Sequence, residues 1–315
     1  MATGYGERQF LMAENSTGRT VVAGVDGSVP ALQAARWAAD EAVRRQVPLR
    51  LIQVVDVSSV AAQFPAPRDF FTEMEAEGRR QLAKTKTEIR RDHPELDIDT
   101  ILRVDNVVRA LIGISHDADL MVLGARGSGG FRGLLTGSTA VALVAHGHCP
   151  VAVIRSTGAG GTPPSHGPVV VGVDGSPTSE AALATAFEEA ATRGTDLVVL
   201  HTWVEYPSDI AYASARQYFI DWEDIETREQ EVLAERLAGW QEKYPDVTVR
   251  RVVTGGRAAK RLLELAADAQ LLVVGSRGRG GFTGMLLGST SQALIHHTPC
   301  PLLIVRPATT EGQVP

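Results

Sequence analysis

The sequence predicts an α/β protein with two tandem open parallel sheets, each of five strands in the order 3-2-1-4-5, with helices on both faces. One observation is that three segments recur in the same order: VVAGVDGS as VVVGVDGS, DLMVLGARGSGGF as QLLVVGSRGRGGF, and HGHCPVAVIR as HTPCPLLIVR. They occupy residues 21–28 and 169–176, 119–131 and 270–282, and 146–155 and 297–306. The other observation is that short apolar runs alternate with segments of helical periodicity, as in parallel sheets joined by crossover helices.

The predicted strands of the first copy are short runs of apolar and β-branched residues. They are TVVAGVD (20–26), LRLIQVVDV (49–57), LDIDTILRV (96–104), LMVLG (120–124) and VAVIR (151–155). Apolar runs of this length are typical of strands that helices cover on both faces.

Helices are predicted between these strands. Ser28 is placed to cap a helix over 31–45, whose apolar residues recur at helical spacing. A longer, charged amphipathic helix spans 70–93, and a third helix spans 107–117. The last begins after the glycine-rich loop and covers 138–146. The second copy repeats the pattern.

Composition limits the classes of protein to which the chain can belong. Its 315 residues are 44% hydrophobic and 22% charged, so each copy can form a core. A net charge of −6 does not suit a general nucleic-acid binder, and no apolar run approaches the roughly 18 residues of a membrane span. The polar start lacks the apolar stretch of a signal peptide, and two cysteines are too few for a disulfide framework. We therefore predict a cytoplasmic protein with reduced thiols, no membrane insertion and no bound nucleic acid.

The repeat also predicts the domain organisation. We expect a flexible N-terminal tail, a first domain, a linker rich in glycine and proline, a second domain and a C-terminal tail. Their boundaries are 1–18, 19–156, 157–167, 168–307 and 308–315.

A carboxylate and a glycine-rich loop are predicted to share one crevice in each copy. Asp26 ends the first strand and Gly124 ends the fourth, and in this strand order the two flank the switch point where ligands bind. Glycines can adopt positive φ, and they let backbone N–H groups approach a ligand closely. The next helix starts near Ser138, where its first N–H groups are unpaired, and Arg126 adds positive charge. The loop suits a polyphosphate and the aspartate suits hydroxyl or amino donors, so together they predict a nucleotide site.

The spacing of the loop identifies its type. It is not a P-loop, because no Lys-Ser/Thr pair follows its glycines, and it follows the fourth strand, unlike a dinucleotide fingerprint. Gly124-x-x-Gly127, nine residues and Gly137-Ser138 match the pattern G-2x-G-9x-G-S/T, and residues 275–289 match it again. With the GVDGS strand ends and H-x-x-C-P before the last strands, nearly the whole chain resembles tandem ATP-binding universal stress proteins of the actinobacterial type. The resemblance implies a fold like that of the adenine-nucleotide alpha-hydrolases.

The resemblance also implies one ATP site per domain, with or without Mg²⁺. In the family, the aspartate after strand one holds the adenosine part, the backbone at the end of strand two contacts adenine, and the glycine loop with its G-S/T pair holds the ribose and phosphates. The first-domain positions are Gly24, Asp26, Val54, Gly124, Ala125, Arg126, Gly127, Ser128, Gly129, Gly130, Gly137, Ser138 and Thr139. The second-domain positions are Gly172, Asp174, Thr202, Gly275, Ser276, Arg277, Gly278, Arg279, Gly280, Gly281, Gly288, Ser289 and Thr290. We include Gly24 and Gly172 because close packing of their backbone against a ligand is expected.

One position departs from the family pattern, and several reactive residues are interpreted as structural. Asp105 stands where the second copy has a glycine, and its carboxylate could repel phosphate or help to bind a divalent ion. Cys149 and Cys300 are interpreted as buried small hydrophobes, and the four tryptophans as packing residues. His146 and His297 are expected at helix C-termini, where histidine is favourable, and no metal ligand is predicted.

These features predict nucleotide-dependent regulation, as a sensor in stress response, dormancy or growth control with a regulatory protein as partner. No catalytic residue is predicted, because the first-strand loops GVDGSV and GVDGSP lack the SGGxDS and HxGH motifs of adenylyl-transferring enzymes. Two alternatives stay open: slow hydrolysis of ATP by a water that an aspartate polarises, and cAMP as the ligand. Residues 151–155 and 302–306 are predicted to pair as sheet edges in an intrachain pseudo-dimer, and two chains to form a homodimer.

Overall fold

The computed structural model describes residues 19–56, 68–127, 137–155, 161–203, 222–279 and 286–306. The first half contains β1 (Val21–Gly24), α1 (Val29–Arg45), β2 (Leu49–Val55), α3 (Arg68–Asp92), β3 (Ile98–Val104), α4 (Val107–Ile114), β4 (Leu120–Gly124), α5 (Ser138–His146) and β5 (Val151–Ile154). The second half contains β6 (Val169–Val173), α6 (Pro177–Arg193), β7 (Leu197–Trp203), α8 (Trp222–Leu237), α9 (Trp240–Lys243), β8 (Val249–Gly255), α10 (Ala258–Ala266), β9 (Leu271–Gly275), α11 (Ser289–His297) and β10 (Leu302–Val305). The predicted tails, 1–18 and 308–315, lie outside the described residues.

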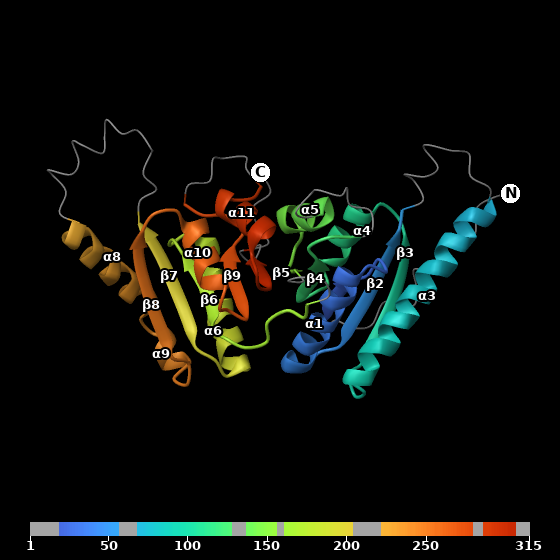
Figure 1. Ribbon diagram of the computed structural model, residues 1–315, viewed down its shortest axis with the longest axis horizontal. Helices are drawn as coiled ribbons and strands as arrows, with labels where there is room; N and C mark the ends of the chain where they lie inside the picture. The colour runs from blue at the N-terminus through green and yellow to red at the C-terminus, as the bar shows by residue number, and fades with distance from the viewer. Residues whose placement is uncertain are drawn as a thin grey trace.

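All ten of these strands belong to one sheet, in the order β3-β2-β1-β4-β5-β10-β9-β6-β7-β8 (Figure 1). The first half of this order is the predicted 3-2-1-4-5, and the second half is the same order reversed. Neighbouring strands within each half are parallel. The predicted α/β fold is therefore confirmed in both copies.

Helices cover both faces of the sheet (Figure 1). Each face of the sheet has its own hydrophobic core, and alternate strand residues point into one core or the other. The first core lies beneath α1, α3, α6 and α8. The second lies beneath α4, α5, α10 and α11. In β1, for example, Val21 and Ala23 join the first core while Val22 joins the second. Each core contains residues of both halves, so hydrophobic packing continues across their junction. No helix in the described part of the chain is long and apolar enough to span a membrane.

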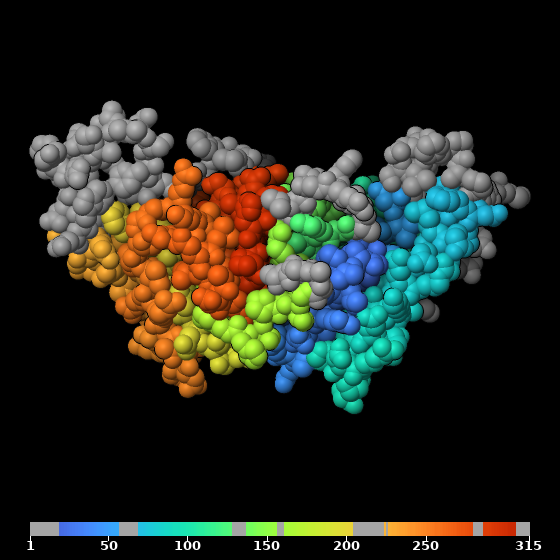
Figure 2. Space-filling model, viewed as in Figure 1, coloured from blue at the N-terminus to red at the C-terminus, as the bar shows by residue number. Residues whose placement is uncertain are grey.

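The junction between the halves is an antiparallel pair of strands. β5 and β10 pair with Leu302 opposite Val153, Leu303 opposite Ala152 and Ile304 opposite Val151. The predicted intrachain pseudo-dimer is confirmed, and both strands become central strands of one sheet. In Figure 2 the second half, yellow-green to red, lies directly against the first, blue to green.

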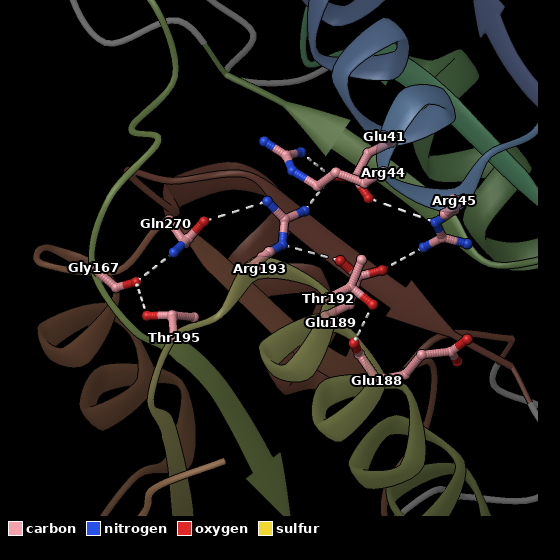
Figure 3. Close-up of polar contacts among 10 residues, drawn as sticks. All are labelled: Glu41, Arg44, Arg45, Gly167, Glu188, Glu189, Thr192, Arg193, Thr195 and Gln270. Atoms are coloured by element: carbon pink, nitrogen blue, oxygen red, sulfur yellow. Dashed lines mark hydrogen bonds and ion pairs between the residues drawn. The ribbon is translucent and has the colours of Figure 1, made fainter. Parts of the chain in front are cut away.

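A buried ion cluster, formed by Glu41, Arg45, Glu189 and Arg193, joins α1 to α6 across the junction (Figure 3). Each arginine pairs with a glutamate on its own helix and with one on the opposite helix. The side chains of Glu41 and Arg193 are only 1% and 3% exposed, so this contact is shielded from water. The sequence patterns did not predict the cluster, because its charged residues look like ordinary helix surface.

The helices that follow the two aspartate loops begin with matched caps. Ser28 accepts a hydrogen bond from the N–H of Ala31, as predicted, and Ser176 accepts one from the N–H of Ser179. Each capping serine stands two residues after its aspartate, so the caps fix the loop that carries the carboxylate.

Candidate functional site

The structure brings the first aspartate and the first glycine loop together. Asp26 follows β1 and accepts a hydrogen bond from the N–H of Ser28 at 3.0 Å. Gly127 follows the neighbouring strand β4, and a Cβ atom on it would lie 2.7 Å from Oδ2 of Asp26. The side of Gly127 that lacks a side chain therefore faces the carboxylate, and the two elements share one crevice at the β1–β4 switch point.

The second domain repeats this contact and tightens it. A Cβ atom on Gly278 would collide with the carboxylate of Asp174. That carboxylate also accepts hydrogen bonds from the backbone N–H of Arg279 at 2.8 Å and from the N–H and hydroxyl of Ser176 at 2.9 and 2.7 Å. Burial raises the pKa of Asp174, but these hydrogen bonds outweigh burial and hold the pKa below its ordinary value. Asp174 is therefore an ionised acceptor near neutral pH.

The described signature glycines serve close approach and not unusual backbone conformation. Gly124, Gly127, Gly137, Gly275, Gly278 and Gly288 all lack positive φ. Our expectation of positive φ in the glycine loops is wrong for these six. Positive φ occurs instead at Gly27 (79°) and Gly175 (77°), directly after the two aspartates. The recurring GVDGS segment carried this signal, although we did not assign these glycines to the site.

Two predicted site glycines are required by packing against a helix backbone, and two others face leucine side chains. A Cβ atom on Gly124 would lie 2.9 Å from the backbone of Pro30, at the start of α1, and Gly275 meets α6 in the same way. A Cβ atom on Gly24 would collide with the side chain of Leu123, and one on Gly172 would meet another leucine, Leu262. The expectation that Gly24 and Gly172 leave room for a ligand is therefore corrected: leucine side chains occupy that space.

The helices after the loops begin without a side-chain cap. Gly137 precedes α5 and Gly288 precedes α11, and neither provides a side-chain acceptor for the first N–H groups. The first residue of each helix, Ser138 or Ser289, is exposed. An uncapped N-terminus leaves N–H donors and the positive end of the helix dipole available to an anion.

Of the described residues between the loop glycines, the first of each pair is buried and the second is exposed. Ala125 and Ser276 are buried, and their N–H groups donate to the last carbonyls of β5 and β10 at 2.8 Å. Their side chains are thus part of the fold. Arg126 and Arg277 are exposed and place positive charge at the loops. The predicted positions Ser128, Gly129, Gly130, Gly280 and Gly281 lie outside the described residues.

The predicted adenine contacts lie near the ends of β2 and β7. Val54 is half-buried one residue before the end of β2, and Thr202 is half-buried at the matching place in β7. Before Thr202 stands the buried His201, whose Nε2 lies 2.7 Å from a carboxylate oxygen of Glu229 on α8. In the first domain Gln53 occupies that position, so the surroundings of the two sites differ.

The two aspartate loops face different partners. Near Gly175, the guanidinium groups of Arg236 and Arg279 occupy the space that a Cβ atom would take, and Arg236 also pairs with Glu180. In the first domain the amide of Gln81 lies over Gly27 instead. A cavity of about 370 Å³ opens there between α1 and α3. In the second domain, the ion pair between Arg236 and Glu180 lies at the matching loop.

Asp105 is held by a neighbour on α4. It pairs with Arg109, and its pKa is lowered by the hydrogen bonds from Arg109 and from the N–H of Asn106. The aligned Gly256 has a φ of 116°, a conformation that favours glycine.

The residues interpreted as structural lie where that interpretation expects them. Burial raises the pKa of Cys149 to about 12 and that of Cys300 to about 11, so both thiols stay protonated and unreactive. His146 and His297 are the last residues of α5 and α11. In the part of the chain that the structure describes, no group of three or more His, Cys, Asp or Glu residues could hold a metal ion.

Known proteins resemble this chain over both domains. A sequence model described as the universal stress protein family matches residues 18–155 and 166–306. One universal stress protein of Mycobacterium tuberculosis is 42% identical over 91% of this chain and 96% of its own length, and another is 37% identical over 95% and 100%. A solved universal stress protein from Archaeoglobus fulgidus has a TM-score of 0.67 at 18% identity, covering 93% of this chain and 97% of that one. The last similarity concerns the fold alone.

Proposed function

The chain belongs to the universal stress protein family, and from that premise we propose that each of its two domains binds one molecule of ATP in the crevice between its aspartate and its glycine loop. The single observation that carries the proposal is the contact between Asp26 and Gly127, which recurs between Asp174 and Gly278. A duplicated contact of this kind, at the switch point of each half of the sheet, favours a common ligand for both domains.

The groups at each crevice suit the parts of a nucleotide. The aspartate is an acceptor for hydroxyl or amino groups of the adenosine part. Backbone groups near Val54 and Thr202 would meet the adenine ring. The uncapped start of α5 or α11 would hold phosphate oxygens, with Arg126 or Arg277 adding charge. Mg²⁺, when present, would neutralise phosphate charge, and no side chain is assigned to it.

Regulation by nucleotide occupancy fits the site better than turnover. General-base catalysis works best with a pKa near the operating pH, whereas the pKa of Asp174 is held below its ordinary value. A strongly ionised carboxylate is a poor base for activating water. Slow hydrolysis of ATP and binding of cAMP are the alternative functions. For the assembly, we propose a homodimer and a regulatory protein partner.

Replacing either aspartate should weaken nucleotide binding at one site only. Asp26→Ala and Asp174→Ala are each expected to reduce the binding free energy at their own site by about 1–3 kcal/mol, because a charge-assisted hydrogen bond is lost. Isothermal titration of ATP and of cAMP into each variant measures the loss and identifies the preferred ligand. Asp99→Ala removes an exposed carboxylate near the start of β3 and is the matched control. If both site variants titrate like wild type, the carboxylates do not hold the ligand.

A further inference from the structure

Two matched arginines cross the junction between the domains. Arg155 directly follows β5 and Arg306 directly follows β10. Because β5 and β10 are antiparallel, the end of each strand lies beside the beginning of the other. Each arginine therefore reaches the last turn of a helix that belongs to the opposite domain.

The contacts of Arg306 are made with α5 of the first domain. Its Nη1 donates to the backbone carbonyl of Val144 at 3.2 Å and also to that of Ala145. These carbonyls lie in the last turn of α5, where no further helical N–H is available to them. Arg306 thus supplies both hydrogen bonds and positive charge to the C-terminal end of the helix.

Arg155 makes the reciprocal contacts with α11 of the second domain. Its Nη2 donates to the carbonyls of Ile295 at 3.1 Å and His296 at 2.7 Å. Ile295 and His296 align with Val144 and Ala145 of the first domain. The same cross-domain arrangement therefore occurs twice.

These positions are electrostatically costly for an arginine. Burial and the charge of Arg126 lower the pKa of Arg155, and burial and the charge of Arg277 lower the pKa of Arg306. Each guanidinium thus lies half-buried next to the cation of its own domain's glycine loop. The carbonyls at the end of the opposite helix offset this cost, so the contact with that helix favours an arginine here.

The helices that receive these contacts are the ones that begin at the proposed phosphate positions. α5 runs only from Ser138 to His146, and its N-terminus has no side-chain cap. In a helix of nine residues, hydrogen bonds to the last carbonyls hold in place the same short backbone segment whose first N–H groups an anion would meet. α11 has the same length and the same uncapped start.

We propose that Arg306 is a positioning residue for the nucleotide site of the first domain, and that Arg155 is one for the site of the second domain. The inference rests on the proposed function and adds that each site is completed by the other domain. Neither arginine is assigned a contact with the nucleotide. Each acts through the helix whose far end it holds.

The test measures one site at a time. Gly278→Ala is expected to abolish binding at the second site, so ATP titration of this variant measures the first site alone. Gly127→Ala in the same way leaves only the second site to be measured. In the first background, Arg306→Gln should weaken ATP binding by about threefold to tenfold, the scale of a charge at a helix terminus. In the second background, Arg155→Gln should produce the same loss. Arg36→Gln, which removes a surface ion pair with Glu88, is the control and should change neither affinity.

A second measurement separates positioning from general damage to the fold. Arg306→Lys keeps a cation that can reach the helix end and should restore most of the affinity that Arg306→Gln loses. Hydrogen exchange should become faster in α5 for Arg306→Gln and in α11 for Arg155→Gln, with or without nucleotide.

The results decide whether each arginine acts on the nucleotide site of the opposite domain. If Arg306→Gln weakens the site of its own domain, or leaves both the first site and the exchange of α5 unchanged, the inference is wrong. Wild-type protein that binds no adenine nucleotide would instead refute the proposed function. The exchange data would then still show whether each arginine holds the helix of the opposite domain.

Discussion

Replacing Glu189 with alanine is expected to lower the free energy of unfolding by about 3–5 kcal/mol, because it removes one of the two carboxylates that pair with the buried guanidinium of Arg193. Glu189 pairs with Arg193 on its own helix, N–O distance 3.0 Å, and with Arg45 on α1. Its side chain is 6% exposed, so water cannot replace the lost carboxylate. Arg193, 3% exposed, would keep only Glu41 as an ionic partner among the described residues.

The symmetry of this cluster explains why one substitution has so large an effect. Glu41 and Glu189 occupy matching positions in α1 and α6, as do Arg45 and Arg193. Burial and the charge of Glu189 raise the pKa of Glu41, and the charges of Arg193, Arg45 and Arg44 oppose this rise. Removing Glu189 leaves Arg44, Arg45 and Arg193 paired with the single carboxylate of Glu41.

Urea denaturation of wild type and Glu189→Ala gives the difference in unfolding free energy. Glu264→Ala is the matched control, since Glu264 also pairs with an arginine on its own helix but is 47% exposed. Surface pairs of that kind contribute roughly 0.2–1 kcal/mol. Equal losses for the two variants would mean that the buried cluster does not stabilise the junction.

The double variant Gly127→Ala with Gly278→Ala should lose about 2.5–6 kcal/mol of nucleotide binding energy at each site. About 1.5–3 kcal/mol comes from displacing the aspartate from its ligand, and about 1–3 kcal/mol from a methyl group placed in a closely packed crevice. The added Cβ atom on Gly127 would lie 2.7 Å from the carboxylate of Asp26, which must therefore move. Neither glycine has positive φ, so backbone strain does not contribute.

Isothermal titration with ATP measures this loss, and thermal unfolding shows whether the variant is folded. Gly113→Ala is the control, because nothing lies within 4 Å of a Cβ atom at this position in α4. Alanine is the better helix former, so the control should bind normally and be slightly more stable. A folded double variant with wild-type affinity would show that the crevices are not the binding sites.

Much of the fold could be predicted because the same motifs occur in both copies of the repeat. The repeated GVDGS segments place each aspartate at the end of a first strand, and the repeated glycine loops place Gly124 and Gly275 at the ends of fourth strands. With the switch-point rule, this is enough to bring each aspartate to its loop. The pairing of β5 with β10 was also predicted, from two apolar strands at expected sheet edges.

What sequence reasoning missed depends on contacts between distant residues. The cations of Arg155 and Arg306 follow apolar strands like any exposed strand end, and only the antiparallel junction shows that they reach the opposite helices. Likewise, Gly24 and Gly172 look like ligand-facing glycines until the leucines beside them are seen. Pattern and spacing fix neighbours along the chain, whereas these roles depend on tertiary packing.

The most direct measurement of the central claim is the number of ATP molecules bound per chain at saturation. Equilibrium dialysis of the wild-type protein against labelled ATP gives this number, and competition with unlabelled cAMP tests the ligand. The two matched crevices predict two bound ATP molecules per chain, displaced only weakly by cAMP. A folded chain that binds no ATP, or that binds cAMP in preference at both sites, would contradict the account.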